Sequence, residues 1–95
     1  MIRSFACREA EGLFHGRFAR HLPQDIQRVA QRRLRQLHEA KDLTDLAAPP
    51  GNRLEALHGN RAGQHSIRIN DQWRICFVWN EGGAEQVEIV DYHRG

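Results

Sequence analysis

The spacing of hydrophobic positions in this 95-residue chain changes near Gly51. Before that point, apolar residues recur every three or four positions between Pro23 and Ala40, and arginine and glutamine fill the opposite face. This pattern predicts an amphipathic helix, and a proline suits its first turn because the missing N–H is not needed there. The apolar stripe consists of Ile26, Val29, Ala30, Leu34 and Leu37.

Shorter segments surround this helix. Residues 1–6 alternate loosely enough to form a short strand, and residues 7–14 read as a short helix. The stretch DLTDLAA, residues 42–48, allows another helical turn, which the PPG sequence of residues 49–51 ends.

After Gly51 the apolar residues alternate with polar ones, as in strands with one buried face. Four strand-like segments cover 52–58, 64–70, 73–79 and 86–93, separated by turn-forming sequences. Connections this short force neighbouring strands to run antiparallel. The expected fold class is therefore α+β, with two N-terminal helices packed on a small antiparallel sheet, and residues 1–95 are expected to form a single domain.

The register of the middle hairpin follows from its hydrophobic faces. Directly opposite residues of an antiparallel pair lie on the same side of the sheet. If the apolar residues of both strands face one core, Ile69 opposes Trp73 across a three-residue loop, and Arg68 then opposes Arg74 on the other face.

Two arginines directly opposite each other destabilise an empty sheet. A bound phosphate would remove that cost, so Arg68 and Arg74 are a candidate phosphate clamp. The alternative is that both guanidinium groups turn into water or pair with Glu55 or Glu88 on adjoining strands.

The net charge of +2 is small, but thirteen of the fourteen basic residues are arginine. Arginine presents the planar fork that binds phosphate through two hydrogen bonds, although codon bias explains the same composition equally well. Three of these arginines, Arg28, Arg32 and Arg35, share the outer side of the long helix, as a solvated face or as an RNA contact.

The chain contains no apolar run long enough for a membrane span and no signal-peptide pattern, so we expect no membrane association and a cytoplasmic location. Cys7 and Cys76 fit no metal-binding spacing and are expected to be reduced thiols. Asp91 and His93 together with His65 offer three ligands for zinc or iron, but no further motif supports such a site, so no metal or other cofactor is expected.

The last strand-like segment ends in Asp91, Tyr92 and His93. Metal-free RNA cleavage needs a base for the 2′-OH proton, an acid for the leaving 5′-oxygen and positive charge for the phosphorane. These three side chains together with an arginine cover those roles. If the strand continues, however, Tyr92 points away from the other two, and polar residues at a strand end are also typical of simple fraying.

Two blocks of the chain resemble the HigB family of toxins, including its GraT-type members, within the RelE/ParE superfamily. They are PPGNRLEALHGNRAGQHSIRINDQWRICF, residues 49–77, and VEIVDYH, residues 87–93. The most specific features are the G-x-R-x-G-x-x-S-I-R-x-N-x-x-W-R-I pattern and the terminal D-Y-H.

The resemblance implies a RelE-like fold and a ribosome-dependent mRNA endonuclease that works without metal in the decoding site. It also implies silencing by a HigA-type helix-turn-helix antitoxin, through which alone the toxin would meet DNA. By position, Arg74 matches the arginine that holds the scissile phosphate, and Asp91, Tyr92 and His93 match the catalytic cluster. Arg68 and Arg61 are candidates for substrate contacts.

The chain departs from the family pattern after the helices. Some members have histidine followed three residues later by lysine, whereas this chain has Glu55 and His58. Glu55 is then a candidate base toward the 2′-OH, with His58 in the cationic position, or it simply pairs with Arg53 or Arg74. This departure keeps open a second function, a non-catalytic module that binds RNA, the ribosome or the antitoxin and blocks translation without cleavage.

Overall fold

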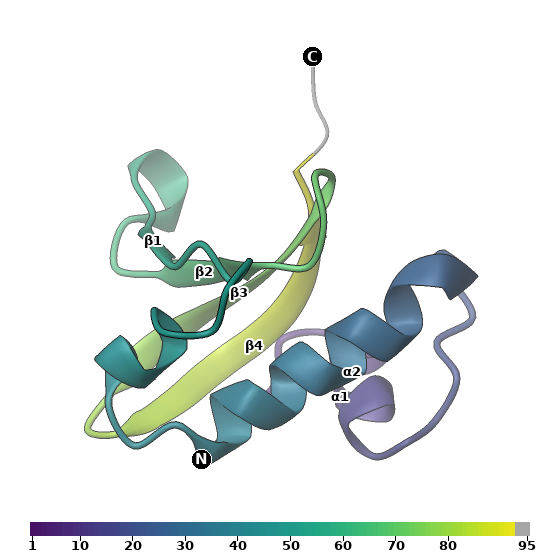
Figure 1. Ribbon diagram of the computed structural model, residues 1–95, viewed down its shortest axis with the longest axis horizontal. Helices are drawn as coiled ribbons and strands as arrows, with labels where there is room; N and C mark the ends of the chain where they lie inside the picture. The colour runs from purple at the N-terminus through teal and green to yellow at the C-terminus, as the bar shows by residue number, and fades with distance from the viewer. Residues whose placement is uncertain (93–95) are drawn as a thin grey trace.

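The computed structural model describes residues 1–92. Its elements, in chain order, are α1 (Arg8–Phe14), α2 (Gln24–Glu39), the 3₁₀ turn η1 (Leu43–Leu46), β1 (Glu55–Ala56), the 3₁₀ turn η2 (Gly59–Arg61), β2 (His65–Arg68), β3 (Trp73–Asn80) and β4 (Gly83–Asp91). The strands form one antiparallel sheet in the order β1-β2-β3-β4 (Figure 1). The expected α+β class is confirmed.

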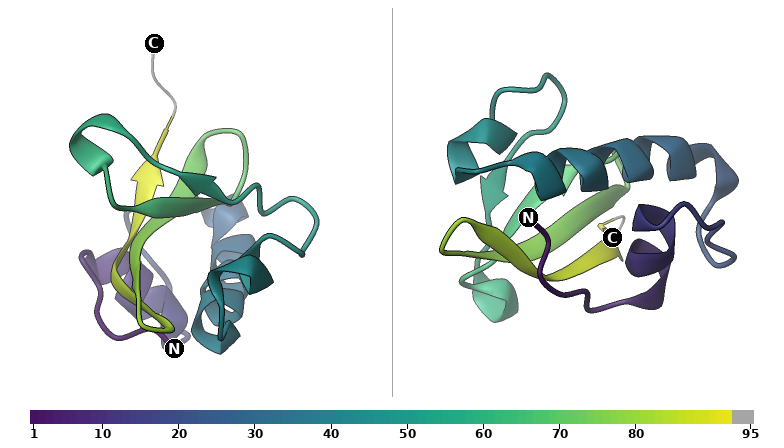
Figure 2. Two further views of the ribbon diagram at one scale, coloured as in Figure 1. Left: turned by 90° about the vertical axis from the view of Figure 1, so that its left-hand side faces the viewer. Right: turned by 90° about the horizontal axis from the view of Figure 1, so that it is seen from below.

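The core lies between α2 and the apolar face of the sheet. The apolar stripe of α2 is buried against Ile67, Ile75 and Phe77, and Phe77 is fully buried. The short helix α1 contacts α2 and β4 and completes this layer (Figure 2). Burial of this single face leaves the other face of the sheet for polar side chains.

The N-terminal segment runs beside β4 as two isolated parallel bridges, Ile2 with Ala84 and Phe5 with Val87, instead of the short strand expected there. The bridges are isolated because β4 is irregular at this point. Its register against β3 shifts between Cys76 and Val78, which marks a β-bulge.

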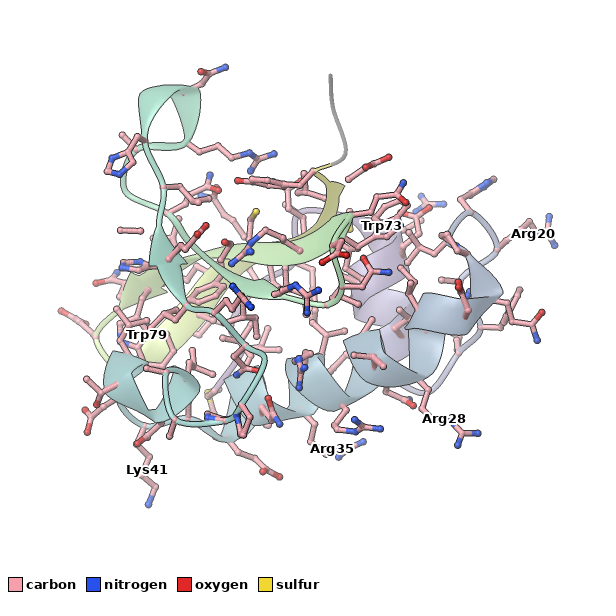
Figure 3. All side chains as sticks on the ribbon, turned by 45° about the horizontal axis from the view of Figure 1, so that its top comes forward. Arg20, Arg28, Arg35, Lys41, Trp73 and Trp79 are labelled. Atoms are coloured by element: carbon pink, nitrogen blue, oxygen red, sulfur yellow. The ribbon has the colours of Figure 1, made fainter. Side chains whose placement is uncertain are left out.

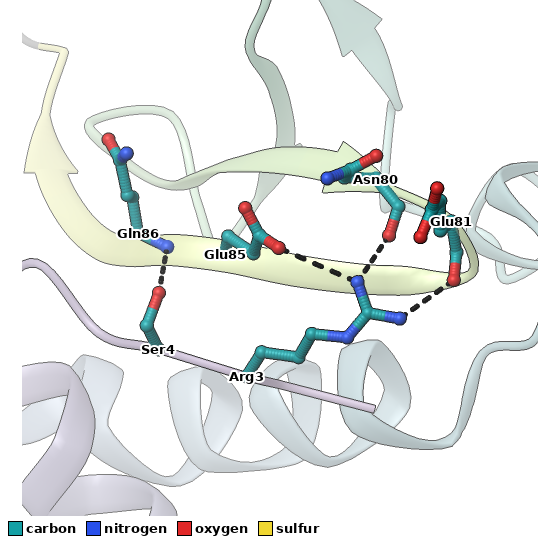
Figure 4. A network of polar contacts seen from close by, with 6 residues as sticks. All are labelled: Arg3, Ser4, Asn80, Glu81, Glu85 and Gln86. Atoms are coloured by element: carbon teal, nitrogen blue, oxygen red, sulfur yellow. Dashed lines mark hydrogen bonds and ion pairs between the residues drawn. The ribbon is translucent and has the colours of Figure 1, made fainter.

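Side chains of the N-terminal segment fasten it to the β3–β4 hairpin (Figure 4). The Arg3 guanidinium donates to the carbonyl oxygens of Asn80 at 2.6 Å and Glu81 at 2.7 Å. The Ser4 hydroxyl accepts a 2.9 Å hydrogen bond from the Gln86 N–H. Gln86 lies in the irregular part of β4 and has a left-handed backbone, with a φ of 54°. Its N–H is satisfied by Ser4 of the N-terminal segment.

The β2–β3 hairpin has the predicted register. Ile67 lies opposite Ile75 and Arg68 lies opposite Arg74. The Ile69 N–H donates to the Trp73 carbonyl at 2.9 Å across the loop 70–72. The predicted three-residue loop and the arginine pair are therefore confirmed.

Two strand boundaries differ from the expected ones for the same backbone reason. Glu81 and Gly82, with φ values of 51° and 77°, make a tight turn that lets β4 begin at Gly83. Near Gly51, positive φ values at Gly51 and Arg53 (85° and 47°) turn the chain, so β1 is limited to Glu55–Ala56. A left-handed residue departs from extended strand geometry, so regular pairing is interrupted there.

The loop between α1 and α2 is held by one buried amide. Oε1 of Gln27 accepts from the Ala19 N–H at 2.9 Å, and its Nε2 donates to the carbonyls of Ala19 at 2.6 Å and Leu22 at 3.1 Å. Gln27 thereby satisfies three backbone groups of a loop with no regular structure. Within residues 1–92, no helix has the length and apolar character that crossing a membrane requires.

We predict that Gln27→Leu lowers the free energy of unfolding by about 2–4 kcal/mol, because a side chain of similar size leaves those backbone groups unpaired. Urea denaturation measures the change. The matched control is Gln24→Leu on the exposed start of α2, for which a change within about 0.5 kcal/mol is expected. Equal effects of the two substitutions would contradict the role given to Gln27.

Candidate functional site

A groove of about 600 Å³ opens on the sheet face opposite α2. Its lining comes from β1 and the chain after it, from η2 and from the residue that follows β4: Glu55, Ala56, Leu57, His58, Arg61 and Tyr92. These segments meet because β1 pairs with β2, and β4 pairs with β3 as far as Asp91, the residue before Tyr92. The predicted candidates Glu55, His58, Arg61 and Tyr92 thus share one groove.

Arg74 lies beside this groove and is only 9% exposed. Its Nε donates to the Ser66 hydroxyl at 2.7 Å, and its Nη2 donates to the Arg53 carbonyl at 2.6 Å. The same Nη2 lies 3.6 Å from Oε1 of Glu55, which is 58% exposed. A guanidinium held at two points and facing one exposed carboxylate is suited to bind an anion that replaces the carboxylate.

Tyr92 covers Arg74 from another side. The guanidinium carbon of Arg74 lies 5.9 Å from the centre of the Tyr92 ring, within the range of a cation–π contact. Burial, followed by the neighbouring Cys76 thiol and a hydrogen bond to it, raises the pKa of the Tyr92 phenol. The phenol therefore stays protonated and can donate a hydrogen bond in the groove.

Cys76 lies under the groove and is completely buried. Burial is the main cause that raises the pKa of its thiol, against the opposing effect of Arg61. A neutral, inaccessible thiol makes a poor nucleophile, so Cys76 is a structural neighbour of Tyr92 in this site.

Arg61 reaches back from η2 over the sheet. Its Nη1 donates to Oε2 of Glu88 at 2.8 Å and to Oε1 of Gln64 at 2.9 Å. The hydrogen bond that Arg61 donates to Glu88 is the main cause that raises the pKa of Arg61, and Glu88 balances the charge of its guanidinium. Glu88 is therefore engaged by Arg61 and does not meet Arg74.

The two opposed arginines are neutralised within the protein. Arg74 pairs with Glu55, while Arg68 forms a hydrogen-bonded ion pair with Asp71 in the hairpin loop. Two carboxylates thus offset the repulsion expected between the opposed arginines. The pairing of Arg74 with Glu55 is the alternative to a phosphate clamp that the sequence left open. Nothing in this pairing requires Arg68 and Arg74 to hold one ligand between them.

Asp91 lies on the other face of the sheet from Arg74 and Tyr92. It is opposite Trp73 in the register, and the Gln72 amide donates to its Oδ2 at 3.2 Å. His93, the third residue of the predicted cluster, lies outside the described residues.

His65, the partner considered for a metal site with Asp91 and His93, stacks on Phe77, with ring centres 6.2 Å apart. In the sheet, His65 is opposite Phe77 and Asp91 is opposite Trp73. Phe77 and Trp73 are four residues apart on β3, so His65 and Asp91 are not neighbours in the register. Among residues 1–92, no three histidine, cysteine or acidic side chains gather around a common point.

Ser66 and Cys76, which lie on the same face of the sheet as Arg74, were not among the predicted site residues. The register was the available signal for Ser66, because Ser66 pairs with Cys76 and so lies diagonally beside Arg74. The Arg53 carbonyl had no signal in the sequence, since its direction depends on a left-handed backbone.

The fold and the site define a small α+β protein whose open sheet face presents a fixed arginine, a protonated tyrosine and a cationic wall for an anionic ligand. A family model described as "RelE-like toxin of type II toxin-antitoxin system HigB" matches residues 5–93. The chain therefore belongs to the HigB-like toxins of type II toxin-antitoxin systems.

Individual relatives agree with this assignment. Toxin HigB-1 of Vibrio cholerae serotype O1 is 45% identical over 65 residues, which is 68% of each chain. Endoribonuclease HigB of Proteus vulgaris is 32% identical over 94 residues, covering 98% of this chain and 100% of the relative. An uncharacterised Haemophilus influenzae protein is 32% identical over 68 residues, 72% of this chain and 67% of its own.

We predict that iodoacetamide at about pH 8 modifies the half-buried Cys7 in the native protein, while Cys76 reacts only after unfolding. The raised pKa of Cys76 leaves little thiolate, and the fold denies the reagent access. Mass spectrometry of native and urea-treated samples counts the adducts. Cys7→Ala should give no adduct until urea is added, and rapid labelling of native Cys7→Ala would contradict the buried position of Cys76.

Proposed function

We propose that this toxin is an endoribonuclease that cleaves mRNA on the ribosome by metal-independent acid–base chemistry and thereby inhibits translation. The observation that carries the proposal is Arg74, a buried guanidinium fixed by Ser66 and Arg53 beside an open groove. The full-length similarity to a relative named an endoribonuclease supports the same reaction.

In this mechanism Arg74 binds the scissile phosphate and stabilises the negative charge that develops on it. Incoming phosphate displaces Glu55, whose contact with Arg74 is long and whose side chain is mostly exposed. Donors that are already in place act without reorganisation as the charge develops, which is why a fixed guanidinium is effective. Arg61 and His58 on the groove wall contact the neighbouring RNA backbone. Arg68, opposite Arg74 in the register and paired with Asp71, is a further candidate for a contact with RNA.

Glu55 is the candidate general base. Once displaced from Arg74, its carboxylate remains in the groove and takes the 2′-OH proton, so that the 2′-oxygen attacks phosphorus. The 5′-oxygen leaves with a proton from an acid of the terminal cluster. Tyr92, kept protonated, orients the phosphate or the leaving group through its hydroxyl.

Asp91 and His93 complete the proposed cluster. Asp91 lies on the other face of β4, so in this scheme it acts indirectly. It fixes the end of the strand and thereby the position of Tyr92. His93 is proposed from the family pattern alone, as the further acid–base group.

The proposed partners are mRNA in the decoding site of the cytoplasmic ribosome and a HigA-type helix-turn-helix antitoxin. A toxin of a type II system has an antitoxin partner, and the family assignment supports that much directly. DNA is reached only through the antitoxin.

A second function is favoured by one observation, the carboxylate of Glu55 next to the phosphate-binding guanidinium. A negative charge there opposes phosphate binding unless it moves or is protonated. In this alternative the toxin is a non-catalytic module that binds the ribosome or the antitoxin and stalls translation without cutting.

We predict that purified toxin added to translating ribosomes produces new mRNA 5′ ends, and that Arg74→Ala lowers the cleavage rate by ~10²–10³-fold, the usual loss for one transition-state donor. Primer extension maps and quantifies the ends. Lys41→Ala, which removes an exposed cation that does not line the groove (labelled in Figure 3), is the control and should cut normally. Thermal unfolding of each variant shows that it is folded.

Intact messages on stalled ribosomes, with the wild-type toxin present at the ribosome concentration, would favour the binding module. Cleavage that persists in folded Arg74→Ala would remove Arg74 from the mechanism.

We predict that Glu55→Gln lowers the cleavage rate at saturating ribosomes by ~10²-fold or more, because the amide cannot accept the 2′-OH proton. Glu55→His, which supplies a different base at the same position, should recover most of the rate. Single-turnover cleavage measures both. A rate for Glu55→Gln equal to or above that of the wild type would mean that Glu55 is only a counter-ion of Arg74.

A further inference from the structure

The inner side of Arg74 is held by two groups that do not line the groove. The Ser66 hydroxyl accepts from Nε at 2.7 Å, and the Arg53 carbonyl accepts from Nη2 at 2.6 Å. The two acceptors come from β2 and from the chain before β1, so they fix both the position and the rotation of the guanidinium plane. A buried guanidinium needs such acceptors, since unpaired donors are costly.

Ser66 is completely buried at the centre of the polar sheet face. Its register partners are Glu55 on β1 and Cys76 on β3, which places its hydroxyl between the groove and Arg74. Within residues 1–92, the hydrogen-bond partner of the Ser66 hydroxyl is the Arg74 guanidinium.

Arg53 offers its carbonyl only because its backbone is left-handed, with a φ of 47°. Residues other than glycine seldom adopt this conformation, and it persists where the surroundings impose it. The preceding residue, Asn52, is buried and fixes the chain here. Its side-chain amide donates to the Leu46 carbonyl at 3.1 Å, and its backbone carbonyl accepts from the Arg68 N–H at 2.6 Å. The strained residue is thus anchored to the core on one side and aims its carbonyl at Arg74 on the other.

We propose that Ser66 and the left-handed Arg53 backbone are positioning residues that orient the Arg74 guanidinium toward the groove for phosphate. This inference rests on the proposed function. The outer side of the guanidinium is then the side available to an incoming anion, as the 3.6 Å contact with Glu55 already indicates. Small errors in the placement of a catalytic group cost rate, so both residues should affect cleavage through Arg74.

The orientation itself is measured first, without any activity assay. In ¹⁵N-labelled toxin the Nε–H signal of Arg74, identified by its loss in Arg74→Lys, should be sharp and slow to exchange with solvent. Ser66→Ala should broaden this signal or speed its exchange, and Ser66→Thr should restore it because the hydroxyl is kept. Unchanged protection in Ser66→Ala would overturn the proposed role of Ser66.

The consequence for cleavage follows from the same variants. Ser66→Ala should lower kcat by about ten- to a hundredfold with little change in KM, and Ser66→Thr should recover most of the loss. The matched control is Thr44→Ala, which deletes an exposed hydroxyl in η1 and should cut like the wild type. Loss of Nε–H protection with full cleavage would overturn the inference.

A second pair of variants isolates the backbone of Arg53. Both Arg53→Gly and Arg53→Val remove the exposed guanidinium, but only valine resists a positive φ. Arg53→Gly should therefore keep a higher kcat and a better protected Nε–H than Arg53→Val, with thermal unfolding recorded for both. Equal rates and equal protection would show that the left-handed backbone is irrelevant to Arg74.

Failure of the inference is distinct from failure of the proposed function. If Arg74→Ala cleaves at the wild-type rate, the proposed function fails whatever the signal of Nε–H shows. If Arg74→Ala loses activity while Ser66→Ala and Arg53→Val behave like the wild type, Arg74 is catalytic and the positioning role is wrong.

Discussion

The site depends on one constraint, that the guanidinium of Arg74 is nearly buried and must have its donors satisfied. The fold meets this constraint with a serine from β2 and a carbonyl from a left-handed residue, both on the inner side. Among residues 1–92, the carboxylate on the outer side is that of Glu55, which is mostly exposed and 3.6 Å away, while the Tyr92 ring lies over the guanidinium. The result is a cation with a fixed direction and a replaceable partner, which is what recognition of a phosphate in RNA requires.

Electrostatics on this sheet face are balanced locally. Each arginine of the hairpin pair has its own carboxylate, and Arg61 is paired with Glu88. The free protein therefore tolerates several guanidinium groups on one small face without a bound anion. In the proposed function phosphate takes the place of Glu55, whose carboxylate is mostly exposed and only 3.6 Å from Arg74.

Membership in the HigB-like toxins and the geometry of the groove complement each other. The family indicates the kind of system in which the protein works, whereas the geometry indicates which residues meet. One groove brings together five of the predicted residues: Arg74, Tyr92, Glu55, His58 and Arg61. Asp91 lies on the other face of β4 from Tyr92, so these two neighbouring side chains do not face the same side of the sheet.

The sequence by itself determined the α+β class, the hairpin register, the opposition of Arg68 and Arg74, and the opposite directions of Asp91 and Tyr92. Each of these follows from local periodicity and from the rule that opposed residues share a face. Only the tertiary structure decided the left-handed turn at Arg53, the short β1, and the pairing of Arg61 with Glu88. Those features depend on contacts between segments far apart in the chain. Which side chains pair there depends on their reach and burial, and the periodicity of the sequence does not encode either.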